Sequence, residues 1–270
     1  MLNRPLPLGD APRTELARVR AVLADIDDTL TSDGRLPALA YRALEDLCTA
    51  GFRVVPITGR PAGWCDMIAR FWPVAGVVGE NGAFAFRYDH ARKKMERRYA
   101  RSAPQRAADR HKLDALAAEI VTAVPGAAIS ADQAYREADL AIDYCEDVPP
   151  LARTAVAQIV ALFERAGARA KVSSIHVNGW FGDYDKLSTT RTFLADALGV
   201  DLAQDGDSVA FIGDSPNDGP LFAALPMTVG VANVLDFVGE IAVMPSYVTQ
   251  GRGGDGFAEF ASALLSATPR

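Results

Sequence analysis

The stretch Ala21–Thr31, which has the sequence AVLADIDDTLT, constrains the fold more than any other part of the chain. The apolar run Val22–Ala24 lacks polar alternation, as is typical of a parallel strand buried on both faces. Acidic residues follow at once, with Asp25 and Asp27 two positions apart. Ligands of open α/β sheets bind beyond the carboxyl ends of the strands. The stretch therefore predicts a parallel sheet that carries carboxylates at its ligand-binding edge.

Carboxylates this close together repel each other unless a cation or a shared proton relieves the repulsion. Oxygen ligands suit a hard divalent cation, so we expect Asp25 and Asp27 to lie at a Mg²⁺ site. The alternative is that they are ordinary loop aspartates that cap the next helix. An EF-hand calcium loop is excluded because Leu30 stands where that loop needs glycine.

Strands and helices alternate in two separate parts of the sequence. Residues 21–84 and 183–270 follow a strand–helix–strand order, which predicts a doubly wound α/β core with a parallel sheet. Residues 85–182 contain two predicted helices and several short strands, which predict an inserted α+β cap. A hairpin predicted at Phe84–Tyr88 and Met95–Tyr99 opens this cap. Residues 1–20 are expected to form a loose or surface-packed leader.

Composition excludes several classes of protein. The 270 residues are 49% hydrophobic and carry a net charge of −6, so no overall positive field attracts nucleic acid. The three cysteines are far apart and form no CxxC motif, which predicts a reducing compartment without disulfides or zinc. No apolar stretch approaches the roughly 20 residues that a membrane helix needs. We therefore expect a cytoplasmic protein with no membrane partner.

Polar side chains stand at the ends of several predicted strands of the core. The residues that share this position are Asp25, Asp27, Thr58 and Asp214, while Lys186 stands just before a predicted helix. The ends of parallel strands meet at one edge, so we expect these residues to form one phosphoryl-transfer site. Asp25 would attack phosphorus and Asp27 would exchange the proton with the leaving oxygen and then with water. Thr58 would hold phosphoryl oxygens, Lys186 would offset negative charge, and Asp214 would complete the Mg²⁺ site.

These motifs resemble those of the haloacid dehalogenase (HAD) superfamily of phosphatases. The matching segments, in chain order, are DIDDTLT (25–31), ITGR (57–60), Lys186 and GDSPND (213–218). The inserted module is similar to the cap of the Cof-type, or IIB, branch. The resemblance implies a Rossmann-like core, Asp25 as nucleophile and Asp27 as acid/base. It also implies Mg²⁺ ligation by the Asp25 carboxylate, the Asp27 carbonyl and Asp214, with Asn217 and Asp218 in support.

The resemblance implies a Mg²⁺-dependent phosphomonoester hydrolase that acts on a small phosphorylated metabolite, with a sugar phosphate as the favoured substrate. A phosphomutase of the same fold and a catalytically inactive ligand-binding relative are the alternatives. Both a monomer and a homodimer remain open. The sequence departs from the family at Asp28, where many relatives have glycine, and at Leu187, which replaces the usual glycine after the lysine. Lys171 is the fallback for the lysine position.

Substrate contacts are expected beside the phosphate site and on the cap strands that lead back to the core. The candidates are Asp28, Gly59, Arg60, Asn81, Lys171, His176, Asn178 and Trp180. Arg60 would hold an anionic or hydroxyl group, Trp180 would stack on a sugar ring, and Asn178 would bond to its hydroxyls. The alternatives are that Trp180 packs the hinge and that His176 is an ordinary surface residue.

Three glycines near the C-terminal end, Gly251, Gly253 and Gly256, formally spell a dinucleotide-binding GxGxxG motif. The acidic residue that this fingerprint requires about 20 positions later is missing, and no crossover to a further strand follows. We expect a tight turn beside the active-site edge instead.

Overall fold

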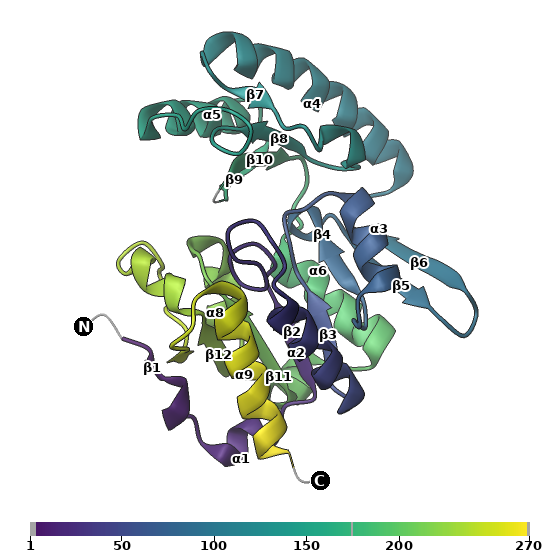
Figure 1. Ribbon diagram of the computed structural model, residues 1–270. Helices are drawn as coiled ribbons and strands as arrows, with labels where there is room; N and C mark the ends of the chain where they lie inside the picture. The colour runs from purple at the N-terminus through teal and green to yellow at the C-terminus, as the bar shows by residue number, and fades with distance from the viewer. Residues whose placement is uncertain (1–3, 174, 269–270) are drawn as a thin grey trace.

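A six-stranded parallel sheet forms the centre of the larger part of the molecule (Figure 1). The computed structural model describes residues 4–173 and 175–268. The strand order is β1-β13-β12-β11-β2-β3, and every neighbouring pair is parallel. The strands are β1 (Leu6–Pro7), β2 (Ala21–Ala24), β3 (Arg53–Pro56), β11 (Val209–Gly213), β12 (Met227–Gly230) and β13 (Tyr247–Val248). The predicted doubly wound α/β core is confirmed.

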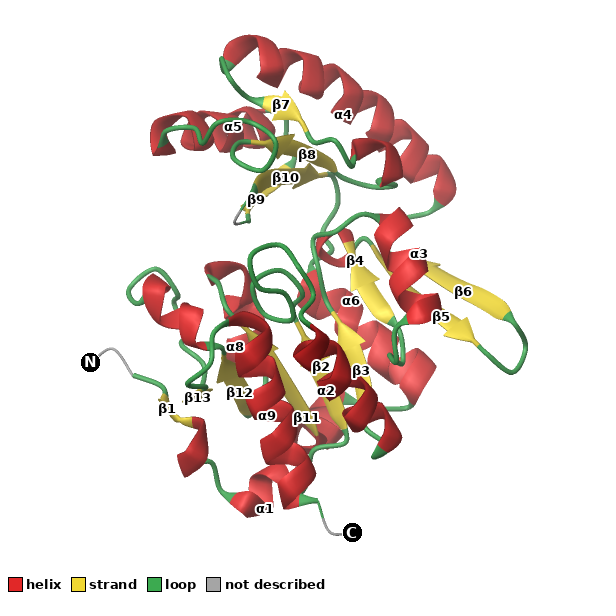
Figure 2. Cartoon of the chain, viewed as in Figure 1, coloured by secondary structure: helices red, strands yellow, loops and turns green. Residues whose placement is uncertain are grey.

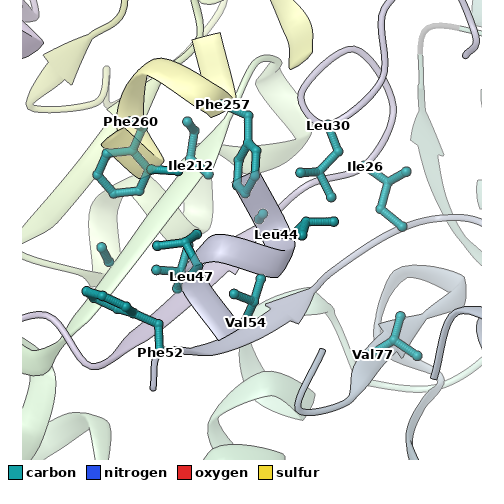
Figure 3. Packing of buried hydrophobic residues seen from close by; sticks show 14 of the residues in the cluster. Ile26, Leu30, Leu44, Leu47, Phe52, Val54, Val77, Ile212, Phe257 and Phe260 are labelled. Atoms are coloured by element: carbon teal, nitrogen blue, oxygen red, sulfur yellow. The ribbon is translucent and has the colours of Figure 1, made fainter. Parts of the chain in front are cut away.

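Helices cover both faces of this sheet. The helices of this part of the molecule are α1 (Arg13–Leu16), α2 (Ala38–Thr49), α3 (Ala62–Phe71), α6 (Lys186–Phe193), α7 (Leu202–Asp205), α8 (Gly219–Ala224) and α9 (Gly253–Ala267). Of these, α3 packs on the antiparallel strands at residues 77–89. Successive strand residues point to opposite faces, so Val22 joins the apolar cluster under α2 and α9 whereas Leu23 joins the cluster under α6 and α8. Figure 3 shows the first cluster, in which Leu44 of α2 and Phe257 of α9 pack over the sheet.

The third strand of the N-terminal half leads out of the parallel sheet. β4 (Val77–Gly79) lies beside the end of β3, where Ile57 and Val78 form a parallel bridge and the Thr58 N–H donates to the Val78 carbonyl at 2.9 Å. It pairs antiparallel with β5 (Phe84–Asp89), which pairs in turn with β6 (Lys94–Tyr99). The hairpin expected in the cap is therefore hydrogen-bonded to β4 and not to the cap sheet. The cap boundaries at residues 85 and 182 remain a prediction.

The inserted module is a four-stranded antiparallel sheet covered by two long helices. Its strands, in spatial order, are β7 (Ala128–Ile129), β8 (Leu140–Asp143), β10 (His176–Trp180) and β9 (Arg169–Val172). Helices α4 (Ala103–Ala123) and α5 (Arg153–Arg165) lie on the side of the sheet away from the core, so the open sheet face is turned toward the core (Figure 2). The predicted α+β module is confirmed, although Ser174, where its last strand was expected to begin, lies outside the described residues.

The described part of the N-terminal leader is packed onto the core. β1 extends the parallel sheet beyond β13, and Leu8, Leu16 and Val19 are buried in the cluster under α9. Within the described residues, the structure offers no helix whose length and hydrophobicity would carry it across a bilayer.

The Gly-rich segment packs against the loop that follows β2. Helix α9 begins at Gly253, whose φ is +49°. A Cβ added there would lie 2.6 Å from the Ser32 Oγ and the Thr31 carbonyl oxygen, so the close approach of two backbones requires glycine. The segment thus supports the loop that carries the acidic motif.

Candidate functional site

Asp25 directly follows β2, and a buried lysine contacts it there. Its backbone N–H continues the ladder of β2 by donating to the Ile212 carbonyl at 3.0 Å. Lys186, the first residue of α6, places its Nζ 2.7 Å from Asp25 Oδ1 and 3.3 Å from Asp218 Oδ1. The Asp185 side chain caps α6 by accepting the Ser188 N–H, which fixes the start of the helix. The fold thus joins residues 161 positions apart in the sequence.

The site holds three buried carboxyl groups, and Lys186 is the cation that contacts two of them. Ligand oxygens of Asp25, Asp214 and Asp218 all lie within 4.8 Å of one another, with Lys186 as their cationic contact. Burial, followed by the charges of nearby carboxylates, raises the pKa of Asp25 to about 8 despite the opposing effect of Lys186. The same causes raise the pKa of Asp214 well above its usual range. Burial lowers the pKa of Lys186, but the two carboxylates in contact with it raise that pKa above its ordinary value.

This donor set fits a hard divalent cation. The oxygens are carboxylate oxygens at the spacing of a shared metal, and the local negative charge is compensated only in part. Asp218 is the least available of the three, because its Oδ2 accepts the N–H groups of Asp214 (3.0 Å) and Ser215 (3.3 Å). Asp214 follows β11 directly, and its Oδ1 accepts a hydrogen bond from Thr29 Oγ1 at 3.2 Å. Asp218 therefore shapes the acidic loop, and Asp25 and Asp214 are the side chains free to meet a metal.

Thr58 and Gly59 form a turn at the end of β3. The fully buried Thr58 accepts the Arg60 N–H on its Oγ1 at 3.0 Å, so its hydroxyl shapes the turn. A Cβ on Gly59 would lie 3.3 Å from the amide group of Asn81, which stands close to the turn. Asn81 has a left-handed backbone (φ 55°), and its Oδ1 lies 3.5 Å from Asn217 Nδ2. The candidate polar loops of both chain halves therefore touch.

Arg60 contacts Asp27, whereas we expected it to hold a substrate group. Its Nη2 donates to Asp27 Oδ1 at 2.8 Å and its Nε lies 3.0 and 3.1 Å from the two Asp27 oxygens. Its Nη1 reaches Glu146 Oε1 of the cap at 3.3 Å. Burial lowers the pKa of Arg60, but the charges of Asp27 and Glu146 raise it above its ordinary value.

Asp28 adopts the left-handed conformation (φ 58°) that favours glycine, the residue that the resemblance implies at this position. Its N–H donates to Thr31 Oγ1 at 3.0 Å, and its carbonyl accepts the Asn233 Nδ2–H at 2.6 Å. These local bonds hold the strained residue in place.

A cavity of about 1050 Å³ lies between the core edge and the cap. The candidate residues that line it are Asp25, Asp27, Asp28, Gly59, Arg60, Asn81, His176, Asn178, Lys186, Asp214 and Asn217. Its volume is at the upper end of the range for small-molecule sites, which is about 300–1,000 Å³. Core and cap thus share one space large enough for a metabolite.

The cap candidates differ in how they meet this cavity. Trp180 is only 2% exposed, stacks on Tyr184 with ring centroids 5.9 Å apart, and is absent from the cavity wall. Lys171 lies exposed on β9, also outside the wall. His176 and Asn178 do line the cavity, but Asn178 Nδ2 donates to Asp139 Oδ2 at 3.0 Å and His176 Nε2 lies 2.9 Å from Glu146 Oε2.

Three buried or interfacial groups join the cap to the core, and sequence analysis included none of them among the site residues. Glu80 accepts four backbone N–H groups, those of Ala62, Glu137, Ala138 and Asp139. Arg136 donates to the Gly59 carbonyl at 3.0 Å, and Glu146 contacts Arg60. Only Glu80 carried a sequence signal, its place directly after a buried strand. Arg136 and Glu146 lie in polar loops without a recognisable pattern.

Comparisons with solved structures identify the fold. A protein from Plasmodium vivax described as a HAD/Cof-like hydrolase is 15% identical, with a TM-score of 0.68 over 94% of this chain and 99% of the other. A sugar phosphatase of HAD subclass IIB is 15% identical, with a TM-score of 0.63 over 92% of this chain and all of the other. The sucrose-phosphatase of Synechocystis, solved with sucrose and phosphate, is 16% identical, with a TM-score of 0.61 over 91% of this chain and 97% of the other.

Neither a protein-family model nor a curated protein matches the sequence. The sequences of the similar structures are less than one fifth identical to this chain, so the comparison shows a shared fold. That arrangement extends over both the parallel core and the inserted cap. The chain has the fold of HAD phosphatases of the Cof-like, IIB type.

Proposed function

We propose that this protein is a Mg²⁺-dependent phosphomonoester hydrolase of the HAD superfamily. The observation that carries the proposal is the meeting of Asp25, Lys186 and Asp214 at one sheet edge, on the wall of a cavity closed over by the cap. A nucleophile, a fixed cation and carboxylates for a metal are the parts that phosphoryl transfer requires.

Asp25 is the nucleophile in this proposal. A carboxylate oxygen of Asp25 attacks the substrate phosphorus, the bond from phosphorus to the leaving alcohol oxygen breaks, and an aspartyl-phosphate forms. Lys186 contacts Asp25 Oδ1 and offsets the charge that this residue and the phosphoryl group bring together. Water then attacks the phosphorus of the aspartyl-phosphate, which releases inorganic phosphate and restores the carboxylate.

Asp27 is the proton carrier. It gives a proton to the leaving alcohol oxygen in the first step and takes one from the attacking water in the second. Asp27 lines the cavity, and a hydrogen bond from Arg60 Nη2 orients its carboxylate. Thr58 fixes the Gly59–Arg60 turn by accepting the Arg60 N–H, and the Gly59 N–H of this turn would hold a phosphoryl oxygen.

The side chains of Asp25 and Asp214 and the backbone carbonyl of Asp27 would hold the Mg²⁺. When bound, the ion supplies charge neutralisation and orientation for the phosphoryl group. Asp218 and Asn217 would keep the acidic loop in place, Asp218 by accepting two of its N–H groups.

The substrate is a small phosphorylated metabolite, and we infer that a sugar phosphate is the first class to test. Two of the similar structures are named as a sugar phosphatase and a sucrose-phosphatase, and the cavity would hold a phosphate with a sugar-sized group. None of the three cysteines forms a disulfide within the described residues, which supports a location in the cytoplasm.

Phosphate release from a panel of sugar phosphates, p-nitrophenyl phosphate and phenyl phosphate tests the proposal. We expect turnover with Mg²⁺ and none with excess EDTA. An Asp25→Asn variant should lose about 10³-fold or more in kcat, because the nucleophile is gone. Asp10→Asn, an exposed aspartate outside the cavity wall, is the matched control and should leave most of the activity.

Turnover that persists without metal, or in the Asp25→Asn variant, would contradict the proposal. Conversion of a sugar 1-phosphate to the 6-phosphate without phosphate release would indicate a phosphomutase instead. Absence of any turnover would favour an inactive ligand-binding relative.

A further inference from the structure

A chain of polar contacts runs from the cap sheet to Asp27, and the chemistry proposed above does not require its outer part. His176 Nε2 lies 2.9 Å from Glu146 Oε2, Glu146 Oε1 lies 3.3 Å from Arg60 Nη1, and Arg60 Nη2 lies 2.8 Å from Asp27 Oδ1. The first two residues belong to the cap and the last two belong to the core. The chain therefore crosses the space between the two parts of the molecule.

The core end of this chain is closely fitted. The Arg60 side chain is 9% exposed, and its guanidinium group lies over the Trp64 ring at 4.6 Å. Two of its nitrogens face Asp27 and the third faces Glu146. An arginine side chain has several rotatable bonds, so contacts at both ends of the planar group are needed to hold one orientation.

At the cap end, the Glu146 side chain is 33% exposed, and its position is set by the loop that carries it. Glu146 lies in the loop after β8, where the buried Asp143 side chain accepts the N–H groups of Cys145, Glu146 and Asp147. These three bonds set the backbone of the loop, and His176 Nε2 lies 2.9 Å from the second carboxylate oxygen of Glu146. The remaining oxygen of Glu146, Oε1, accepts the hydrogen bond from Arg60 Nη1 of the core. This geometry exists only while the cap lies over the core.

We propose that Glu146 is a positioning residue that holds Arg60, and through Arg60 the Asp27 carboxyl, in place for proton transfer when the cap covers the site. The proposal rests on the function proposed above, in which Asp27 protonates the leaving oxygen. A general acid works only within about 2.6–3.2 Å of the atom it protonates. Loss of the Glu146 contact would let Arg60 and the Asp27 carboxyl move, which would slow proton transfer to the leaving oxygen. Cap placement and acid catalysis are coupled through this contact.

Leaving-group dependence distinguishes this role from a merely structural one. The p-nitrophenolate ion leaves readily without a proton, whereas the more basic phenolate ion depends on the general acid. The two phosphate esters otherwise have similar shapes. Because kcat/KM reports the steps up to formation of the aspartyl-phosphate, it isolates the transfer in which Asp27 acts as the acid.

The decisive experiment compares kcat/KM for phenyl phosphate and p-nitrophenyl phosphate in the full-length, Mg²⁺-loaded protein. Glu146→Ala should lower the value for phenyl phosphate about tenfold or more and that for p-nitrophenyl phosphate much less. Glu146→Gln, which keeps an acceptor oxygen for Arg60, should restore most of the phenyl phosphate value. Asp147→Ala removes the same charge from the neighbouring exposed position and should change neither.

A double-mutant cycle tests the route through Arg60. Adding Glu146→Ala to an Arg60→Ala background should cause little further loss, because the group through which Glu146 acts is already gone. If Glu146→Ala does not fold, Glu146→Ser removes the same carboxylate and carries the same expectation. Melting temperatures identify which variants are folded.

Three outcomes would overturn the role of Glu146 in a wild-type protein that turns over both esters. They are an equal loss for both esters, a loss no larger than that of Asp147→Ala, and full additivity with Arg60→Ala. Absence of wild-type turnover on either ester and on the sugar phosphates is a different result, because it refutes the proposed phosphatase function itself.

Discussion

A single cation determines whether three buried carboxylates can coexist at the site. Lys186 is 7% exposed and contacts both Asp25 and Asp218. Without it, the carboxylates would keep their burial cost and lose their nearest opposite charge. Asp28 is a second residue under local constraint, because its left-handed backbone is held by Asn233 and Thr31. The acidic motif thus depends on partners supplied by distant segments.

We predict that Lys186→Met destabilises the metal-free protein by about 3 kcal/mol near neutral pH, because the buried carboxyl groups of Asp25 and Asp218 lose the cation that contacts them. Urea denaturation measures this change. Lys171→Met is the matched control, since Lys171 is exposed on β9 and should shift the free energy of unfolding by no more than about 0.5 kcal/mol. Equal effects of the two changes would show that Lys186 has no electrostatic role in the fold.

The elements of the core and the cap are fastened to each other by a buried glutamate. Glu80 follows β4 with a left-handed backbone (φ 44°) and accepts the Ala62 N–H at the start of α3. Its other bonds come from the cap segment at residues 137–139. Arg136 adds a bond to the Gly59 carbonyl in the same region. A strand end, a helix start and the cap entry therefore share one acceptor group.

Glu80→Ala should lower the free energy of unfolding by at least about 3 kcal/mol, because it leaves several buried N–H groups without an acceptor. We also expect faster proteolysis at residues 136–139, where the cap segment would lose its attachment. Denaturant titration and limited proteolysis measure the two effects. Glu45→Ala on the exposed face of α2 is the control. A Glu80→Ala protein as stable and as resistant as this control would refute the fastening role.

At the scale of the whole molecule, the parallel sheet and the cap enclose an excess of negative charge. Burial raises the pKa of Asp25 from 3.8 to about 8, so between these values the folded protein holds a proton that the unfolded chain has lost. The stability that this proton supplies is complete below pH 3.8 and is lost as the pH rises through about 8. A metal ion at the site competes with the same proton.

We therefore predict that the metal-free protein melts at a lower temperature at about pH 8.5 than at about pH 6, and that Mg²⁺ raises the melting temperature more at the higher pH. Thermal denaturation with Mg²⁺ and with EDTA at the two pH values tests this. Asp214→Asn removes a proposed ligand and should abolish most of the Mg²⁺ effect at both. An equal Mg²⁺ shift at the two pH values would contradict the competition between proton and metal.

The sequence predicted the framework because its signals are local. The apolar run before Asp25 specified a buried strand, and strand ends in a parallel sheet must meet at one edge, so Asp25, Asp214 and Lys186 could be expected together. The structure brings Lys186 Nζ to 2.7 Å from Asp25 Oδ1. The catalytic roles of these residues remain predictions, since geometry shows proximity and activity must be measured.

The cap side of the site could not be predicted in the same way. A glutamate in an irregular loop has no periodicity, so nothing in the sequence pairs Glu146 with Arg60. Trp180 looked available for stacking on a ligand, yet it faces Tyr184 inside the molecule. Which face of a strand is buried depends on what packs against it, and that is decided by the whole fold.

The sequence by itself determined the strands of the core, the acidic residues at their ends and the presence of a separate module. These follow from hydrophobic periodicity and strand ends, which are properties of short segments. Only the tertiary structure decided that Arg60 binds the Asp27 carboxylate, that Glu80 accepts N–H groups of the cap segment and that the hairpin pairs with β4. Those contacts join segments distant in sequence, and their energies depend on burial and on charges supplied from elsewhere in the molecule.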